Sequence, residues 1–261
     1  MRPVYFSLTA LITAVCLIGL TACGAKDPLS PADRAWLQKK GVLNIGVFDA
    51  YPPFGFVDQN GKEVGMSIDY WNLLAQKLNF KVKFHPVSFE KQLKGLESGE
   101  FDSLAGLFPV SERQKAMNFT KSFYVINTHL FVAPDLKGIN SLKDLQDLPV
   151  GVVEGDSSQE VAQKAKLKTE AFSGYQKTVM ALAEGKIKAI ILDEPVVAYY
   201  FKVKGLEGKI RQVPQPLVQG WMTLPVKEGN IQLLQILNRG MSQVSPQEWE
   251  VIEEKWVGRV Q

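Results

Sequence analysis

The chain has 261 residues, 46% of them hydrophobic and 22% charged, and its formal net charge at pH 7 is only +3. This length is enough for one large or two modest globular domains. Because the charges form no basic run or stripe, the sequence argues against a nucleic-acid-binding protein. The two histidines, His85 and His129, lie far apart and have no metal-ligand spacing, and no glycine motif for phosphates or dinucleotides is present. We therefore expect neither a metal nor a cofactor.

The amino terminus has the pattern of a secretory signal peptide. Arg2 precedes the apolar run LTALITAVCLIGL, which is too short for a comfortable membrane span. The run ends in LTAC, which resembles the lipobox of bacterial lipoproteins. This resemblance implies that residues 1–22 are removed and that Cys23 is acylated and anchors the protein to a membrane. An ordinary signal peptide with an incidental cysteine is the alternative.

The first half of the mature chain alternates between predicted strands and helices. Residues 23–40 form a lipidated polar tether and a short helix, which is capped at Ser30 and has Pro31 at its first position. Asn60-Gly61 is typical of a tight hairpin turn. Hydrophobic periodicity predicts strands over 42–48, 81–87 and 101–108 and helices over 66–80 and 89–99.

The same alternation continues after residue 128. Predicted strands cover 129–133, 149–155, 169–172, 187–193 and 220–226. Predicted helices cover 141–148, 157–167, 175–186, 194–204, 230–245 and 246–258. The segments LESGEFDSLAGLF and LAEGKIKAIILDEP also echo each other, which is weak support for two similar lobes. The order predicts an α/β fold with a mostly parallel sheet and helices on both faces.

The stretch GLFPVSERQKAMNF, residues 106–119, contains a candidate anion site. Ser111 and Gln114 match a capping box, which predicts a helix with Arg113 in its first turn. A cation at that helix end is unfavourable unless an anion joins it. A surface arginine that pairs with Glu112 is the alternative.

A second candidate lies at the end of strand 187–193. Ligands of open α/β sheets bind outside the carboxyl ends of the strands, and both Arg113 and Asp193 follow such an end. One predicted lobe therefore offers a cation and the other an anion. A helix N-cap before Pro195 is the alternative role of Asp193.

Five segments in this order resemble the bacterial extracellular solute-binding proteins of family 3, which include polar amino-acid receptors of ABC importers. The resemblance covers residues 41–258 and rests on the segments GVLNIGVFDAYPPFGFVDQNGKEVGMSIDYW, LESGEFDSLAGLFPVSERQKAMNFTKSFY, SLKDLQDLPVGVVEGDSS, GKIKAIILDEPVVAYY and the closing KW. It implies a two-lobed, type II periplasmic-binding-protein-like fold, in which two mixed sheets flanked by helices close on a ligand. Lobe 1 would comprise 41–123 plus 222–261 and lobe 2 would comprise 124–221. The hinge strands would lie near 124–127 and 219–221.

The resemblance also implies the ligand contacts. Arg113 matches an arginine that clamps the ligand carboxylate in a bidentate way, and Asp193 matches the acid that receives the ligand ammonium. The other matching positions are aromatic or backbone contacts: Tyr51, Phe89, Gly106, Phe108 and Ser157. Core packing is the alternative for Tyr51 and Phe89, and Asp69 and Asp102 are interpreted as structural.

Two departures from the family pattern concern the ligand. Phe108 and Val110 stand where many amino-acid receptors carry Ser or Thr, so two hydroxyls for a carboxylate are missing. Phe48 stands where an acid often precedes the first aromatic contact, and Asp49 is one residue away. A larger, flatter or more apolar anion is therefore an alternative to an α-amino acid.

Alternative functions follow from two further resemblances. The segments LSPADRAWLQKKGVLNIGV and VGVVEGDSS are similar to solute-binding modules of sensor kinases and of lytic transglycosylase F, which implies a regulatory role. Cyclohexadienyl dehydratases also resemble the family and use an acid in the same cleft, for which Glu154 or Asp156 is the candidate here. A solvated strand-to-helix loop is the simpler interpretation of these two acids.

We therefore expect a binding protein and not an enzyme. It would be lipid-anchored in the cell envelope, on the periplasmic side of a bacterial membrane or at the cell surface. It would capture a small anionic or zwitterionic, amino-acid-like solute between its lobes, for an ABC permease or a sensor protein. We expect a monomer.

Overall fold

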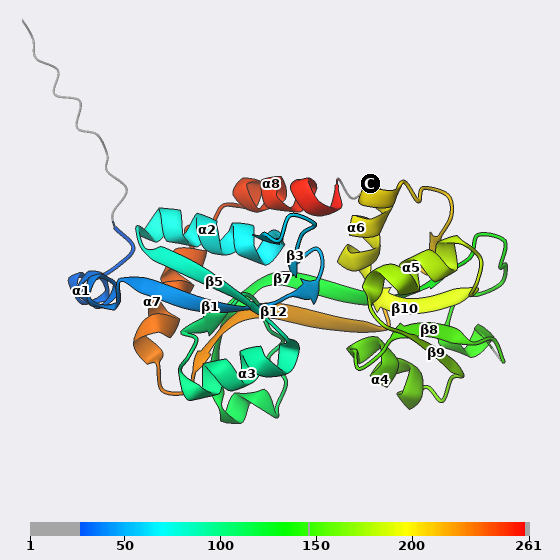
Figure 1. The fold of residues 1–261 in the computed structure, drawn as a ribbon, viewed down its shortest axis with the longest axis horizontal. Helices are drawn as coiled ribbons and strands as arrows, with labels where there is room; N and C mark the ends of the chain where they lie inside the picture. Colours follow the sequence, from blue (N-terminus) through cyan, green and yellow to red (C-terminus); the bar gives the residue numbers. More distant parts are fainter. Residues whose placement is uncertain (1–26, 146, 259–261) are drawn as a thin grey trace, which may run out of the picture.

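The computed structural model describes residues 27–145 and 147–258, which form two α/β lobes side by side (Figure 1). Nine strands form one hydrogen-bonded sheet in the order β5-β1-β6-β12-β7-β10-β8-β9, with β11 paired to β7. The two predicted sheets are thus joined into one, because two long strands run through both lobes. The predicted signal peptide and Cys23 lie outside the described residues.

The two connecting strands are β7 (Met117–Val132) and β12 (Val218–Lys227). They pair antiparallel along the length of β12. Residues 124–127 and 219–221, where the hinges are expected, lie opposite each other in this ribbon. The path between the lobes is therefore a two-stranded ribbon and not a pair of separate loops.

The first lobe is built on β1, which pairs in parallel with β5 on one side and with β6 on the other. Its core is mainly apolar: Trp71 and Leu74 from one helix pack with Leu233 and Leu237 from another, and all four side chains are fully buried. The main elements of this lobe are α1 (Pro31–Lys40), β1 (Val42–Phe48), α2 (Met66–Leu78), β5 (Lys81–Val87), α3 (Phe89–Ser98), β6 (Ser103–Leu104), α7 (Ile231–Met241) and α8 (Pro246–Val257).

The second lobe is built on β10, which pairs with β7 antiparallel and with β8 in parallel. Every residue of β8 and of β10 is buried, as expected for apolar strands covered by helices on both faces. Its elements are β8 (Val150–Val153), α4 (Ser157–Lys164), β9 (Thr169–Phe172), α5 (Tyr175–Ala183), β10 (Ala189–Asp193), α6 (Glu194–Lys204) and β11 (Arg211–Gln212).

A small sheet beside β1 holds the loop that carries Tyr51. It consists of β2 (Ala50–Tyr51), β3 (Gly55–Val57) and β4 (Glu63–Val64). The loop after Tyr51 is tied to the start of α2, since the amide of Met66 donates to the carbonyl of Pro53 at 2.7 Å. The position of Tyr51 therefore depends on the turn that joins β4 to α2.

The predicted capping box at Ser111 is wrong. The segment forms a single 3₁₀ turn over Arg113–Lys115 that begins after Glu112 and has no side-chain cap. The Gln114 amide donates instead to the carbonyl of Pro109, at 2.9 Å. One 3₁₀ turn has almost no aligned dipole, so the anion-binding character of this segment rests on the guanidinium alone.

Two other predicted elements are shorter than expected. The helix predicted over 141–148 is a 3₁₀ turn over Leu142–Leu145. The strand predicted over 101–108 forms a ladder only over Ser103–Leu104, and Leu107 makes an isolated bridge to Thr223. The chain leaves the sheet here, and this irregular segment reaches the space between the lobes.

The lobes touch along one edge through α6 and α8 (Figure 1). The Lys202 ammonium donates to the carbonyls of Glu254 and Lys255 at the end of α8, both at 2.7 Å. Within the described residues, no helix combines the length and the apolar character needed to cross a membrane.

We predict that Gly65→Ala destabilises the protein much more than Gly61→Ala. Both glycines have positive φ, +139° and +76°, but a Cβ at Gly65 would lie 2.2 Å from the carbonyl oxygen of Phe54, whereas Gly61 faces open space. The backbone strain should cost Gly61→Ala about 1–2 kcal/mol, and the added overlap should bring Gly65→Ala to about 3 kcal/mol or more. Urea unfolding measures both losses, and equal losses would contradict the prediction.

Candidate functional site

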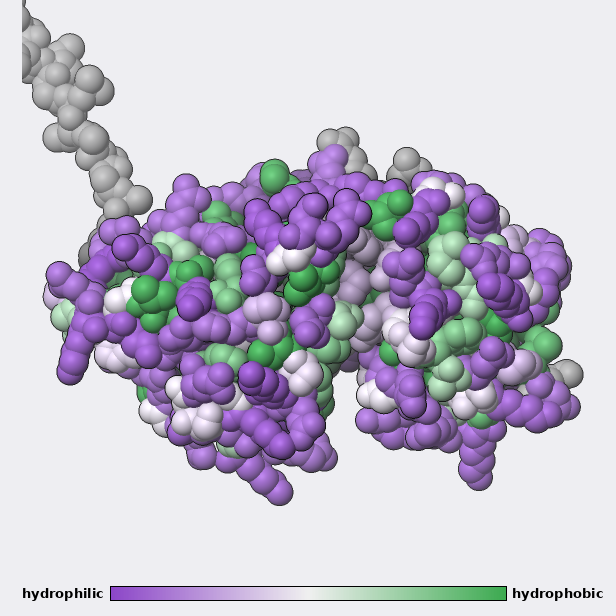
Figure 2. Space-filling view, viewed as in Figure 1, coloured by the Kyte–Doolittle hydropathy of each residue, from purple (hydrophilic) through white to green (hydrophobic). Residues whose placement is uncertain are grey.

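A cavity of about 530 Å³ opens between the two lobes. The surface is visibly notched there, on the edge where α3 and α4 face each other (Figure 2). All seven residues predicted as ligand contacts line this cavity: Tyr51, Phe89, Gly106, Phe108, Arg113, Ser157 and Asp193. The structure therefore brings together side chains that are up to 142 positions apart in the sequence.

Arg113 lies on the first-lobe side of the cavity. Its Nη1 donates to the carbonyl of Phe108 at 3.0 Å, and its guanidinium carbon lies 5.3 Å from the centroid of the Phe89 ring. Burial lowers the pKa of the guanidinium from its ordinary value, although an arginine stays charged. Arg113 forms no ion pair with any described residue, including its neighbour Glu112. Glu112 and Glu160 attract the guanidinium only from beyond ion-pair distance, and a half-buried cation without a close ion pair is suited to bind an anion.

Asp193 lies on the second-lobe side and is 6% exposed. It occupies the N-cap position of α6, but its side chain does not cap the helix. Its carboxylate accepts hydrogen bonds from the hydroxyls of Tyr51 and Thr128, each at 2.6 Å. Burial raises the pKa of Asp193 to about 6, and the two hydrogen bonds oppose this shift. Tyr51 belongs to the first lobe, so the Tyr51–Asp193 bond crosses the cavity.

Phe108 connects the cavity wall to the β7–β12 ribbon. A Cβ on Gly220 would lie 2.8 Å from the Phe108 ring, so the ring packs directly on the backbone of β12. Gly106 likewise lies against Met222, because a Cβ there would come within 2.6 Å of the Met222 sulfur. The two predicted contacts Gly106 and Phe108 thus lie where the cavity meets the expected hinge.

Tyr51 and Phe89 take part in an aromatic wall that also includes Phe48. The Phe48 and Phe89 rings meet edge to face with centroids 5.7 Å apart, and the Phe48 and Tyr51 rings lie 6.4 Å apart. Phe89 is 38% exposed, which speaks against simple core packing for this ring. Phe48, where the family often has an acid, lines the cavity as an apolar surface.

Sequence reasoning missed Tyr175 as a site residue and considered Asp156 only as a candidate acid of the dehydratase alternative. The Tyr175 hydroxyl donates to the Asp156 carboxylate at 2.7 Å, and the Tyr175 ring lies 5.3 Å from that of Tyr51 across the cavity. Burial raises the pKa of Tyr175, and the neighbouring Asp156 adds to the shift. Asp156 also caps α4 by accepting from the Ser158 amide at 2.9 Å, so Ser157 is the first residue of that helix. The position of Asp156 in a strand-to-helix loop directly before Ser157 was the available signal for that acid. Tyr175 is the first residue of α5 and lies far from Ser157 in the sequence.

The charges that line the cavity are divided between the lobes. The first lobe contributes one cation, Arg113, and no carboxylate among the lining residues that the structure describes. The second lobe contributes four carboxylates and no cation among its described lining residues: Glu154, Asp156, Glu160 and Asp193. Such an arrangement is complementary to a ligand that carries both signs of charge, and it disfavours a ligand that carries only negative charge.

The two acids interpreted as structural are confirmed as such. Asp69 accepts from the Lys255 ammonium at 2.6 Å and from the Trp256 indole at 2.7 Å, which ties the closing KW motif to α2. Asp102 accepts from the Asn44 amide at 2.8 Å and pairs with Lys40 at 2.6 Å. Neither lines the cavity between the lobes.

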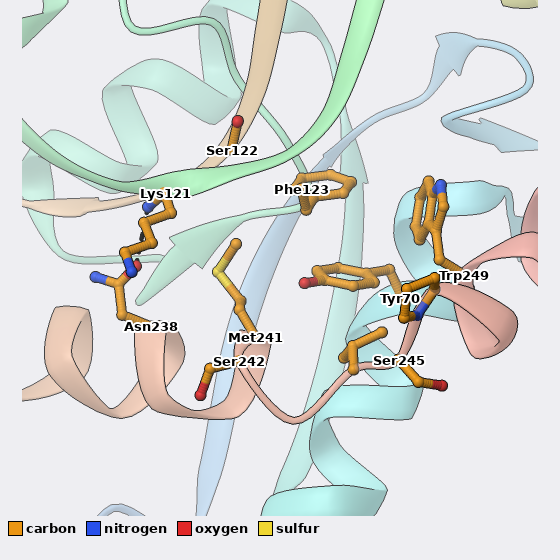
Figure 3. Close-up of a pocket in the computed structure, with 11 residues that line it drawn as sticks. Tyr70, Lys121, Ser122, Phe123, Asn238, Met241, Ser242, Ser245 and Trp249 are labelled. Carbon is orange, nitrogen blue, oxygen red and sulfur yellow. Dashed lines mark hydrogen bonds between the residues drawn. The ribbon is translucent and has the colours of Figure 1, made fainter.

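Two other hollows differ in character from this cavity. One of about 270 Å³ lies on the flank of the first lobe, where the Tyr70 and Phe123 rings stack with centroids 4.5 Å apart and Trp249 closes one side (Figure 3). Another of about 690 Å³ lies on the α6–α8 edge. Neither brings an uncompensated cation and a buried acid together from opposite lobes, which is why the cavity of about 530 Å³ between the lobes is the candidate site.

The comparisons with known proteins agree with this geometry. Residues 43–259 match the bacterial extracellular solute-binding proteins, family 3. The chain belongs to this family. The arginine-binding extracellular protein ArtP of Bacillus subtilis (strain 168) is 28% identical over 200 residues, which cover 75% of each chain.

Further relatives of this family 3 member support the same assignment. The ABC transporter arginine-binding protein 1 of Escherichia coli (strain K12) is 24% identical and covers 82% of this chain and 90% of its own. The solved structure of an ancestral arginine-binding protein bound to glutamine is 30% identical, with a TM-score of 0.69, and covers 84% of this chain and 99% of its own. Both the family resemblance and the type II periplasmic-binding-protein fold are thus confirmed.

We predict that the stability of the free protein falls as Asp193 ionises. The folded-state pKa of about 6 lies above the ordinary value of 3.8 for an aspartate, so protonated Asp193 favours folding below about pH 4 and this contribution is lost as pH rises through 6. The loss is on the order of 3 kcal/mol. Asp193→Asn cannot titrate, so its stability relative to the wild type should rise between pH 4 and 7 in urea unfolding. If the difference in stability between Asp193→Asn and the wild type did not change with pH, the raised pKa of Asp193 would be contradicted.

Proposed function

We propose that this protein is an extracytoplasmic receptor that captures an amino acid between its two lobes. The observation that carries the proposal is the placement of an unpaired guanidinium, Arg113, and a buried carboxylate, Asp193, on opposite lobes of one cavity. An α-amino acid presents a carboxylate and an ammonium group a few ångströms apart. One ligand can thus satisfy both groups only when the lobes are together.

Each half of the ligand would meet a suitable group. The guanidinium of Arg113 has free donors, since only Nη1 bonds to the carbonyl of Phe108, and planar donors bind a carboxylate in a bidentate way. The first residue of α4, Ser157, would add a hydroxyl from the opposite lobe. The ammonium would replace or join the hydroxyls of Tyr51 and Thr128 at Asp193, and it would stabilise the ionised carboxylate there.

The lining charges narrow the ligand class. Four carboxylates against one guanidinium favour an amino acid whose net charge is zero or positive over a simple anion or a dicarboxylate. The printed names of ArtP and of the Escherichia coli relative are consistent with this, because both are arginine-binding proteins. We take a zwitterionic or cationic amino acid as the ligand class.

Closure on the ligand would follow from lobe boundaries at 123/124 and 221/222. These boundaries lie in the β7–β12 ribbon, where Tyr124 pairs with Met222. The Tyr51–Asp193 bond and the Tyr51–Tyr175 ring contact favour the form in which the lobes are together. A ligand shifts the balance further because it bonds to both lobes in that form only.

The dehydratase alternative finds little support in the acids considered for it. Glu154 is exposed to solvent. Asp156 is engaged as the cap of α4 and as the acceptor of the Tyr175 hydroxyl. Asp193 is the lining acid whose pKa, about 6, would suit proton transfer. Turnover of a prephenate-like substrate that Asp193→Asn abolishes would decide for an enzyme.

We further propose that Cys23 anchors the receptor in the cell envelope and that an ABC permease or a sensor protein recognises its closed form. The transporter role is supported by relatives named as ABC transporter components. Residues 27–30 precede α1, which Asp33 ties to α7 by accepting from the side chains of Gln232 and Arg239. A short tether would thus end at a firmly docked helix on the first lobe.

We predict that Arg113→Ala abolishes amino-acid binding. The variant loses both bonds to the ligand carboxylate, so affinity should fall about a hundredfold or more. Arg113→Lys should recover only part of it, because an ammonium cannot bind in a bidentate way. Lys115→Ala is the matched control, since Lys115 lies exposed in the same 3₁₀ turn and does not line the cavity.

The measurement is a thermal-shift and calorimetric screen of L-arginine, L-lysine, L-glutamine and L-cystine. A ligand at about a hundred times its Kd should stabilise the wild type by roughly 2.7 kcal/mol. Ligand binding that survives in Arg113→Ala would show that the carboxylate site lies elsewhere.

We predict that Cys23→Ala releases the protein from the membrane. Acylation of the Cys23 thiol is the only anchor proposed, so the variant should lose incorporation of labelled palmitate and move to the soluble fraction. Fractionation and labelling of cells that express each form measure this. Unchanged membrane association would mean that another segment holds the protein.

A further inference from the structure

Gln92 is a buried polar residue of the cavity that the binding geometry above does not use. It lies in α3, is 2% exposed and lines the space between the lobes. Its backbone amide bonds to the carbonyl of Ser88 at 3.0 Å as part of the helix. Among the described residues, none bonds to its side-chain carboxamide, which is not sealed in the core but faces the cavity.

The surroundings of Gln92 are those of an apolar helix face. The other buried residues of α3 are Gly95 and Leu96, and Leu96 belongs to a cluster with Phe101 and Leu104. A leucine of similar volume would suit this face without a polar group to satisfy. A carboxamide that faces the cavity without a protein partner stays free to bond to whatever occupies the cavity. The ligand is the partner that the cavity can supply.

The position of Gln92 relative to Arg113 and Phe89 indicates that it would meet the side chain of the ligand. Phe89 lies three residues earlier in α3, so the two share one face of the helix. The Arg113 guanidinium lies over the Phe89 ring, and the Phe48 ring meets the Phe89 ring edge to face. A ligand held at its carboxylate by Arg113 can extend its side chain along these rings toward Gln92.

We propose that Gln92 determines specificity by hydrogen-bonding a neutral polar group at the end of the side chain of the bound amino acid. This inference rests on the proposed function and names the ligand class more closely. A carboxamide both donates and accepts, so it pairs well with an amide or a hydroxyl. The first-lobe lining that surrounds it has no described carboxylate to neutralise a terminal ammonium or guanidinium. The site therefore selects an uncharged, hydrogen-bonding side chain.

The test compares two probes that differ only at the end of the side chain. L-glutamine and L-norleucine share the carboxylate and ammonium groups and have similar length. Calorimetry on the wild type should show L-glutamine bound on the order of tenfold more tightly. Gln92→Leu should abolish this preference and keep or improve the affinity for L-norleucine. A wild type without preference, or a preference that survives in Gln92→Leu, overturns the proposal.

The stability of the free protein gives a second and independent test. If the carboxamide has no structural partner, Gln92→Leu should leave the urea midpoint unchanged or raise it. Gln232→Leu is the matched control, because the Gln232 amide does have a partner in Asp33 and its loss should lower the midpoint. If the urea midpoint of Gln92→Leu falls as far as that of Gln232→Leu, the proposal is overturned.

The two tests also separate this proposal from the proposed function. If no amino acid in the panel binds the wild type, the proposed function fails. The comparison of urea midpoints then still gives a result. A lower midpoint of Gln92→Leu means that the carboxamide is structural, which overturns the inference. An unchanged or higher midpoint means that the carboxamide has no protein partner, which supports a role toward another ligand.

Discussion

The antiparallel pairing of β7 with β12 is the interaction on which the rest of the structure depends. It joins two sheets into one and gives the lobes a common ribbon along which the cavity is built. Phe108 packs on this ribbon at Gly220, and the Phe108 carbonyl accepts from Arg113. The guanidinium is thereby linked through Phe108 to the ribbon that joins the lobes.

The cavity separates its charges by lobe, and this separation has a physical consequence. A lone cation on one side and four carboxylates on the other attract each other only weakly through water. Removing any of these charges from water costs desolvation free energy. A ligand with both signs of charge removes that cost on both sides together. The direct Tyr51–Asp193 bond shows that the lobes can also meet without charge pairing, through a phenol that satisfies the acid.

Polar groups that line the cavity lower the stability of the free protein, and their presence is explained by ligand binding. Asp193 has a raised pKa because burial disfavours its charged form, and Gln92 holds a carboxamide on an apolar helix face. Asp33 and Asp69 are different, because ammonium, guanidinium or indole groups of the protein bond to them. Among the described residues, Asp193 bonds only to neutral hydroxyls, whereas Asp33 and Asp69 pair with cations of the protein. Pairing with a cation of the protein thus separates the structural acids from the acid proposed for ligand recognition.

The order of strands and helices, and hence the fold, could be read from the sequence because it rests on local periodicity and on caps such as Ser30 and Gly99. The positions of Arg113 and Asp193 at strand ends could be read for the same reason. The 3₁₀ turn at Arg113 could not, since Gln114 finds the carbonyl of Pro109 only in the folded loop. Nor could the bonds from Tyr51 and Thr128 to Asp193, or the lack of a partner for Gln92. Those depend on which long-range neighbours the ribbon brings together, and that is decided by tertiary packing alone.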